Sequence, residues 1–130
     1  PQDIALSDVR KGADMFKKVN TPVLGVVENM SGLFLSGNTN NPNSKIHINN
    51  EELEIDVNGN FNINIDIFKK DGGQKESERL GVPLLGKIPL SKEIMNATDS
   101  GIPIVVSNSN QKTGEVYFSL ADKVSKIVKL

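Results

Sequence analysis

The N-terminal segment spaces its apolar residues with the period of an α-helix. Residues 3–18 are polar on most positions and end in two lysines, while an aspartate stands at their start, so the charges complement the helix dipole. We expect an amphipathic helix over this range. Its narrow buried face is predicted to consist of Ala5, Val9, Ala13 and Phe16.

The next apolar run is continuous instead of periodic. Residues 23–27 (VLGVV) follow Thr21-Pro22 and end abruptly at Glu28-Asn29. A short run of this kind is typical of a strand buried on both faces of a parallel sheet. Ligands bind beyond the carboxyl ends of such strands. Asn29 is therefore a candidate ligand-binding residue at the end of a central strand.

The middle of the chain changes to alternation with period two. Residues 36–43 (SGNTNNPN) are typical of a loop. Period two after this loop indicates antiparallel strands with one buried face. The alternating apolar residues are Ile46, Ile48, Leu53, Ile55, Val57, Phe61, Ile63, Ile65 and Ile67.

The parity of the turns predicts a register for these strands. A three-residue loop at 58–60 pairs Val57 with Phe61 and Ile55 with Ile63, whereas a two-residue turn would place Val57 opposite a polar residue. A four-residue turn at 49–52 likewise pairs Ile48 with Leu53. The sequence therefore predicts a three-stranded antiparallel β-meander inserted into an α/β chain.

Helices and buried strands alternate again from Asp71 onward. We expect a helix over 74–80 closed by Gly81, a strand over 82–88, and a helix capped by Ser91 and running to about Thr98. An extended segment over 104–106 and a helix over 111–130 follow. The apolar face of that last helix is Val116, Leu120, Val124 and Ile127 or Val128. This alternation predicts an α/β fold with a mainly parallel sheet and flanking helices.

Composition excludes several classes of function. The chain has 15 basic and 16 acidic residues and a net charge of −1, so no electrostatic footprint favours nucleic acid or an anionic membrane surface. It contains no cysteine, and no apolar run is long enough to span a membrane. We expect a cytoplasmic protein. The chain starts at Pro1 with helix-like residues, and we expect it to be a fragment or a processed chain.

The sequence contains no recognisable catalytic or metal-binding set. Its one histidine, His47, stands on the polar side of a predicted strand, where we expect it to face solvent. Phosphate-loop, zinc and nucleophile motifs are absent. The remaining candidates are the two strand ends. An asparagine side chain matches the donor and acceptor edge of adenine, so Asn29 could bind a base against a wall formed by Ile88, Pro89 and Leu90; strand termination alone would also explain these residues.

Three segments of the chain resemble a known family. PQDIALSDVRKGADMFKKVNTPVLGVVENMS, GGQKESERLGVPLLGKIPLSKEI and SGIPIVVSNS are similar to the C-terminal half of Mrp/ApbC-type P-loop ATPases, the iron–sulfur cluster carriers related to the MinD and ParA ATPases. The resemblance implies a fold that is the C-terminal half of a Rossmann-like P-loop NTPase. Residues 1–130 would then be the C-terminal part of one domain, with the β-meander inserted over about residues 36–70.

The resemblance also implies a function and a binding site. The whole protein would be a homodimeric, cytoplasmic protein that binds ATP with Mg²⁺, hydrolyses it, and passes iron–sulfur clusters to client apoproteins. Asn29 matches the family's adenine-contacting asparagine, and Ile88, Pro89 and Leu90 match the strand end that borders the base. The family's phosphate loop, Mg²⁺ ligand and water-positioning aspartate precede the matched region, so this chain alone should not hydrolyse ATP.

The chain departs from the family pattern after ENMS. Many members carry a Cys-x-x-Cys pair there, through which two subunits bridge one cluster. The matching stretch here is SGLFLSGNTNNPN, without cysteine. The resemblance therefore supports ATP as a cofactor, whereas this chain supplies no thiolate ligand for a [4Fe–4S] cluster.

Two other functions compete with the iron–sulfur carrier. A MinD/ParA-like regulatory ATPase would bind protein partners without a cluster, and an independent binding module would display the meander. If strands from another part of the protein complete the sheet, apolar residues should be exposed on that side in this chain. We expect these residues to include Val23, Val26 or Leu84.

Overall fold

The computed structural model describes residues 3–48, 51–68, 71–107 and 112–129. The elements are α1 (Asp3–Lys18), β1 (Val26–Asn38), β2 (Lys45–Ile48), β3 (Glu51–Glu54), β4 (Asn60–Ile65), α2 (Gly72–Leu80), β5 (Leu84–Leu90), α3 (Lys92–Ser100), α4 (Ile104–Ser107) and α5 (Lys112–Val128). The chain contains both helices and strands, as predicted for an α/β fold, but four strands follow one another from β1 to β4 and three helices from α3 to α5.

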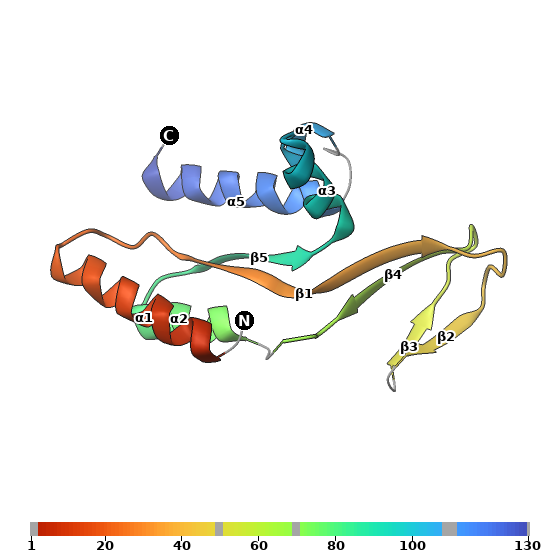
Figure 1. Ribbon diagram of the computed structural model, residues 1–130, viewed down its shortest axis with the longest axis horizontal. Coiled ribbons are helices and arrows are strands. Elements are labelled where there is room, and N and C mark those ends of the chain that lie inside the picture. The colour runs from red at the N-terminus through yellow and green to blue at the C-terminus, as the bar shows by residue number, and fades with distance from the viewer. Residues whose placement is uncertain (1–2, 49–50, 69–70, 108–111, 130) are drawn as a thin grey trace.

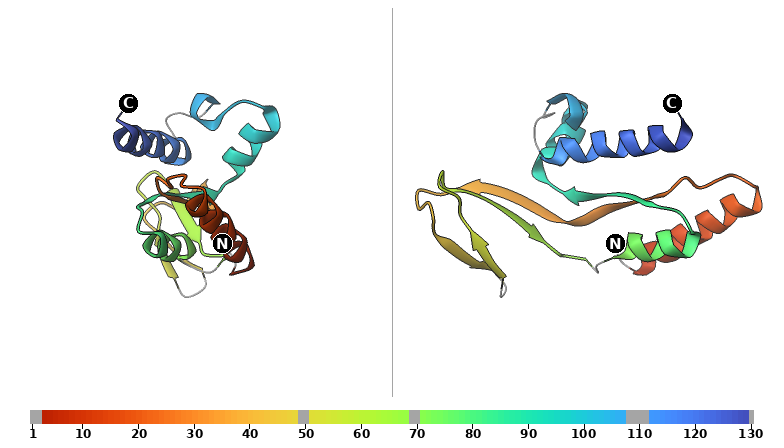
Figure 2. Two further views of the ribbon diagram at one scale, coloured as in Figure 1. Left: turned by 90° about the vertical axis from the view of Figure 1, so that its left-hand side faces the viewer. Right: turned by 180° about the vertical axis from the view of Figure 1, so that it is seen from behind.

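A mixed sheet lies between two groups of helices. Its strand order is β4-β1-β5, in which β1 runs parallel to β5 and antiparallel to β4. Helix α5, together with α3 and α4, lies on one side of β1 and β5, and α1 and α2 lie on the other side (Figure 1). The β2–β3 hairpin is a separate two-stranded sheet. It lies at the far end of the molecule from α1 and α2 (Figure 2).

Strand β1 is longer than predicted and does not end at Asn29. It runs on to Asn38, which makes the loop predicted at 36–43 wrong for its first residues. The parallel register with β5 shifts between Asn29 and Leu33, and Met30 has a positive φ of 54°. Beyond this irregularity, residues 33–38 pair with β4. The strand continues because this second partner satisfies its backbone groups.

The predicted three-stranded meander is wrong. Strand β4 pairs with β1, where Leu35 lies opposite Ile63, and not with β3. In the hairpin Ile46 lies opposite Leu53, and Ile48 lies opposite Glu51 instead of Leu53. The turn that precedes β4 is held by the Asp56 carboxylate, which accepts hydrogen bonds from the backbone N–H groups of Asn58 and Asn60, both at 2.8 Å. This turn is bonded to the end of β1, because the Thr39 N–H donates to the Gly59 carbonyl oxygen at 2.9 Å. Val57, expected to pair with Phe61, is 72% exposed in this turn.

The predicted bounds of α1 are confirmed, but of its predicted buried face only Ala13 is buried. Leu6 and Ala13 are buried, whereas Ala5, Val9 and Phe16 are exposed. Helix α1 contacts α2, so a helix and not a broad sheet surface covers it, and its buried face is correspondingly small.

The predicted helix caps are confirmed. Gly81 has the left-handed conformation at the end of α2, with φ 68°. The Ser91 hydroxyl accepts a hydrogen bond from the N–H of Ile94 at 3.1 Å, which caps α3.

Two predicted strands have different bounds or a different structure. Strand β5 is displaced by two residues from the range 82–88 and includes Pro89 and Leu90. Residues 104–106 are helical, in α4, and not extended. The backbone N–H groups of Val106 and Ser107 donate to the carbonyl oxygen of Pro103, at 2.9 and 3.1 Å. A proline is already suited to the first turn of a helix, because its φ is fixed and it has no N–H to leave unpaired.

Helix α5 packs closely on β5, as its predicted apolar face requires. A Cβ atom at Gly86 would lie 2.8 Å from Cδ2 of Leu120, so a larger residue here would require the Leu120 side chain to move. The Lys123 ammonium donates to the Leu85 carbonyl oxygen at 2.6 Å. Val116, Leu120 and Val124 are half-buried, whereas Ile127 and Val128 at the end of the helix are each 40% exposed.

Exposed apolar residues occur next to the predicted positions. Val23, Val26 and Leu84 are half-buried, whereas Leu24 and Val27 are 39% and 43% exposed. Near β1, the exposed apolar residues therefore lie one position after the predicted ones. Among the described residues, we find no helix long and apolar enough to cross a membrane.

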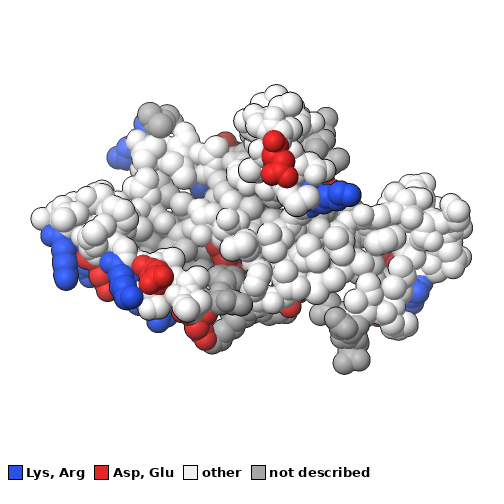
Figure 3. Space-filling view, viewed as in Figure 1, with Lys and Arg blue, Asp and Glu red and all other residues white. Residues whose placement is uncertain are grey.

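A buried carboxylate joins α1 to α2. Glu76 is 1% exposed and accepts from Arg10 Nε at 3.0 Å and from Arg79 Nε at 2.7 Å. Arg79 also reaches Asp14 on α1 at 3.1 Å. The hydrogen bonds from Arg79 and then Arg10 hold the pKa of Glu76 below its ordinary value of 4.5, although burial opposes them. Acidic and basic side chains follow one another along α1 in Figure 3.

Replacement of Glu76 should make the free energy of unfolding less dependent on pH under acidic conditions. Because the folded-state pKa of Glu76 is lowered, its contribution is complete above the unfolded value and is lost as pH falls through the folded value. Urea unfolding of the full-length protein from about pH 6 to about pH 3 should therefore show a shallower loss for Glu76→Gln. At neutral pH this variant should be less stable by about 1.5–3 kcal/mol, since two charged hydrogen-bond partners lose a carboxylate.

The matched control is Glu78→Gln, an exposed glutamate on the same helix. It should follow the wild-type profile. If wild type and Glu76→Gln lose the same unfolding free energy as the pH falls, the assignment of this pH dependence to Glu76 is contradicted.

Candidate functional site

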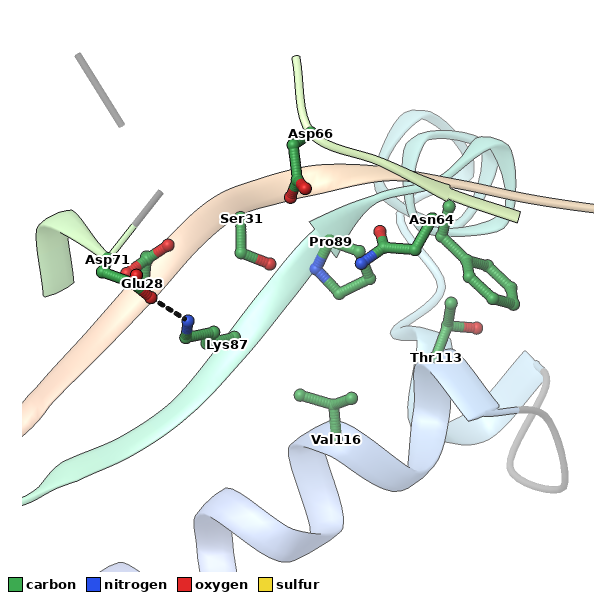
Figure 4. Close-up of a pocket in the computed structure, with 10 residues that line it drawn as sticks. Glu28, Ser31, Asn64, Asp66, Asp71, Lys87, Pro89, Thr113 and Val116 are labelled. Atoms are coloured by element: carbon green, nitrogen blue, oxygen red, sulfur yellow. Dashed lines mark hydrogen bonds and ion pairs between the residues drawn. The ribbon is translucent and has the colours of Figure 1, made fainter. Parts of the chain in front are cut away.

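A cavity of about 570 Å³ opens between the sheet and α5. Figure 4 shows its side chains converging from β1, from β5, from the segment around β4 and from α5. Phe34, Pro89 and Val116 supply apolar walls. The polar lining residues are Ser31, Asn64, Thr113, Glu28, Asp66, Asp71 and Lys87.

The described lining offers little to attract an anionic ligand. Among the described residues of the lining, Glu28, Asp66 and Asp71 carry carboxylates and Lys87 carries an ammonium. Lys87 Nζ lies 3.1 Å from Asp71 Oδ1, so its charge is already engaged. A phosphate group would therefore find no unpaired cation among the described lining residues. An uncharged ring with hydrogen-bonding edges fits the lining better, because apolar walls and a few convergent polar groups are what such a ligand requires.

Thr113 is an unusual member of this lining. It lies in the first turn of α5 and is 3% exposed. Its hydroxyl is buried without a hydrogen-bond partner, the one such side-chain atom identified among the described residues. Buried polar groups in proteins are nearly always paired, so this unpaired hydroxyl beside the cavity is an exception.

Glu28 lies between this cavity and a second one. Its side chain is 3% exposed and lines both. One carboxylate oxygen, Oε2, accepts a hydrogen bond from the backbone N–H of Gly73 at 2.7 Å, at the start of α2. A carboxylate at a helix N-terminus is stabilised by the helix dipole. Glu28 therefore attaches the strand that carries Asn29 to α2.

The predicted site residues fall on both cavities. Pro89 lines the first cavity, whereas Asn29 lines the second, which measures about 340 Å³ and borders α1 and α2. Asn29 is exposed, and its Oδ1 accepts from the N–H of Met30 at 2.9 Å. Ile88 is the strand partner of Asn29, and Leu90 is opposite Leu33. The structure thus makes Asn29 and Ile88 neighbours but does not bring Asn29 and Pro89 into one cavity.

Sequence reasoning missed Glu28 and Thr113. Glu28 directly follows an apolar run and was interpreted as the polar exit of a strand. The glycine pair at the start of α2 was a possible signal, because a backbone that must accept a close neighbour often uses glycine. Thr113 carried no signal, since its burial depends on how α5 packs against distant residues.

The described residues do not form an obvious metal site. His47 is solvent-facing, as predicted: its side chain is 72% exposed and its Nε2 lies 3.8 Å from Glu52 Oε2. No cluster of three or more histidine, cysteine, aspartate or glutamate side chains suited to a metal ion occurs in the part of the chain that the structure describes. Iron–sulfur clusters are held by cysteine thiolates, and the sequence contains no cysteine. The residues present therefore do not fit a cluster.

Comparison with known proteins defines the class. Residues 1–61 and 50–125 match a family described as "ParA: NUBPL iron-transfer P-loop NTPase". The chain is 35% identical over 129 residues to "Iron-sulfur protein required for NADH dehydrogenase, mitochondrial" of Arabidopsis thaliana, which covers 99% of this chain and 34% of that protein. It is 36% identical over 129 residues to the mouse "Iron-sulfur cluster transfer protein NUBPL", covering 99% and 33%. With the Escherichia coli K12 "Iron-sulfur cluster carrier protein" the identity is 36% over 125 residues, covering 96% and 28%.

These matches, together with the α/β fold, define a P-loop NTPase of the ParA group. Within that group the chain belongs to the NUBPL iron-transfer family. The resemblance to iron–sulfur cluster carriers is thereby confirmed. The chain spans 28% to 34% of the length of these three relatives.

The Glu28–Gly73 contact predicts that Gly73→Ala is destabilising. A Cβ atom there would lie 2.7 Å from both Cβ and Oε2 of Glu28, and α2 would have to move away from β1. We expect a loss of about 1–3 kcal/mol in the free energy of unfolding, measured by urea denaturation of the full-length protein.

Gly12→Ala is the matched control. Gly12 lies within α1, and a Cβ atom there would meet nothing within 4 Å. Alanine should therefore stabilise by about 0.5–1 kcal/mol through the lower backbone entropy of the unfolded chain. Equal effects of the two substitutions would show that the contact with Glu28 is not tight.

Proposed function

We propose that this chain is part of an iron–sulfur cluster carrier that binds ATP. Support comes from the matched relatives, whose names describe carriers or transfer proteins for iron–sulfur clusters. We further propose that residues 1–130 form the C-terminal part of one P-loop NTPase domain. Residues 36–70, which contain the β2–β3 hairpin and β4, are then an addition to its α/β framework.

Within such a protein, this chain would hold the base of the nucleotide. The single observation that carries this proposal is the cavity between β1, β5 and α5, with apolar walls, a strand-end proline and a described lysine that is already paired with Asp71. This lining suits a neutral base better than phosphates. The triphosphate, its Mg²⁺ and the hydrolytic groups would lie against other parts of the protein. Hydrolysis of ATP is therefore a property that we assign to the whole protein.

Asn29 is also proposed to contact the base, which requires the base to extend past Glu28 from the first cavity toward the second. Asn29 lies beside Ile88 on the parallel strand pair, one residue after Glu28, which lines both cavities. Its side-chain amide is exposed, and its Oδ1 accepts a hydrogen bond from the Met30 N–H. The amide NH₂ group and the second lone pair of Oδ1 are therefore available to a ligand. Ile88, Pro89 and Leu90 are proposed as the adjoining wall.

The cluster is cargo in this proposal and is not held by this chain. The sequence has no cysteine, so thiolate ligands would come from other residues of the protein or from its partner. We propose a cytoplasmic homodimer that transfers the cluster to client apoproteins.

Anaerobic reconstitution of the full-length protein tests the carrier function. After incubation with iron, sulfide and a reductant, and removal of excess reagents, we expect bound iron and sulfide in equal amounts. Titration with ATP should show saturable binding. A protein that binds ATP but retains no iron after reconstitution would overturn the carrier assignment.

Asn29→Ala tests the proposed base contact. Loss of a partner for the base edge should weaken ATP binding by about 1–3 kcal/mol, measured by titration calorimetry. Asn96→Ala, on the exposed surface of α3, is the control and should bind like wild type. Because Asn29 also accepts from Met30, the thermal midpoint without ligand is recorded for each variant. Unchanged ATP affinity in a stable Asn29→Ala protein would remove Asn29 from the site.

A further inference from the structure

We propose that Thr113 is a specificity-determining residue whose hydroxyl binds the nucleobase in the cavity beneath α5. This inference rests on the proposed function, because it assumes that the cavity holds the base of a nucleotide. It assigns a role to a residue that the sequence did not identify. The ligand class is an uncharged planar heterocycle with hydrogen-bonding atoms on its edge, for which adenine is the example tested below.

Thr113 is 3% exposed and its Oγ1 has no hydrogen-bond partner. A hydroxyl withdrawn from water without a partner destabilises the protein that carries it. Valine has nearly the same shape and no polar atom, so a purely structural requirement at this position would favour valine. A threonine here therefore points to a partner that arrives from outside the chain.

Thr113 lines the cavity together with Val116, one turn further along α5, and with Pro89 and Phe34 on the sheet (Figure 4). The apolar side chains suit the faces of a flat ring, and the Thr113 side chain borders the same space. Rotation about the Cα–Cβ bond exchanges the methyl and hydroxyl groups of threonine between staggered positions. A base edge in the cavity can therefore draw the hydroxyl toward itself.

Thr113 belongs to the first turn of α5, a helix of 17 residues. Helix N-termini often bind phosphate, but Lys87, the described cation in this lining, is already paired with Asp71. An anion would therefore find no unpaired cation among the described lining residues, and a neutral heterocycle is the better ligand. A hydroxyl suits it because it both donates to a ring nitrogen and accepts from an amino group.

The position of α5 allows little adjustment around this residue. Gly86 and Leu120 are in close contact, and Lys123 is bonded to the carbonyl of Leu85. Thr113 is thus presented to the cavity from a helix that is fixed to β5. Because these contacts hold α5 on β5, a shift of the helix should not offset the loss of the Thr113 hydroxyl. A substitution should therefore report directly on the contact between this hydroxyl and the base.

The test compares Thr113→Val, Thr113→Ser and wild type in the full-length protein. The probes are ATP, adenosine and inorganic tripolyphosphate, each titrated by calorimetry. Thr113→Val should weaken ATP and adenosine by the same factor, about 5- to 10-fold, and leave tripolyphosphate unchanged. Thr113→Ser should keep most of the affinity, because it retains the hydroxyl.

A second readout separates binding from structure. Without ligand, Thr113→Val should unfold at the same temperature as wild type or at a higher one, since the unpaired buried hydroxyl is gone. Affinity and stability thus change in opposite directions. Thr98→Val is the control: Thr98 is exposed on α3 and donates to the Ile94 carbonyl oxygen, and its loss should leave all three affinities unchanged.

The outcomes separate this inference from the function on which it rests. A wild-type protein that binds neither ATP nor adenosine overturns both. If wild type binds both and Thr113→Val is unaltered, only the role of Thr113 is overturned. A Thr113→Val protein that loses stability together with affinity, or that loses affinity for tripolyphosphate as well, would also overturn it, because either result indicates a structural defect.

Discussion

The rest of the structure depends on the hydrogen bonding of β1 to two different partners. Its first residues pair with β5 in parallel, and its last residues pair with β4 in antiparallel. The two ladders lie on opposite edges of the strand. Each ladder satisfies the backbone N–H and C=O groups along its part of β1. The strand is therefore irregular where its partner changes. The register shift after Asn29 and the positive φ of Met30 occur at this change.

Local interactions explain what could be predicted from the sequence. The helix bounds of α1 and the caps at Gly81 and Ser91 depend on residues a few positions apart, and the structure confirms them. The partner of β4 was not predictable in this way. Alternation identifies a strand with one buried face but does not specify which strand it joins. Hydrogen bonds from Asn38 and Thr39 to the turn at residues 56–60 place β4 beside β1. The same limit applies at residues 104–106, where β-branched residues follow a proline that starts a helical turn.

The candidate site shows the same division between local and distant causes. Pro89 was identified because strand ends are where ligands bind in α/β sheets, and it does line the cavity. Glu28 is buried because α2, which is distant in sequence, packs against it, and Thr113 is buried because its own helix, α5, packs against distant strands. Hydrophobic periodicity treats a polar residue as exposed, so it has no means of finding a buried one. These two residues nevertheless give the site most of its chemical character.

The β2–β3 hairpin has a consequence for how the protein behaves in concentrated solution. Each of its strands is bonded to the other alone in the part of the chain that the structure describes, so each leaves one edge of backbone groups open. Open edges can recruit strands from other molecules. Charged side chains along this hairpin, including the ion pair between Lys45 and Glu52, oppose that kind of pairing. The hairpin can therefore extend away from the rest of the molecule without acting as a template for aggregation.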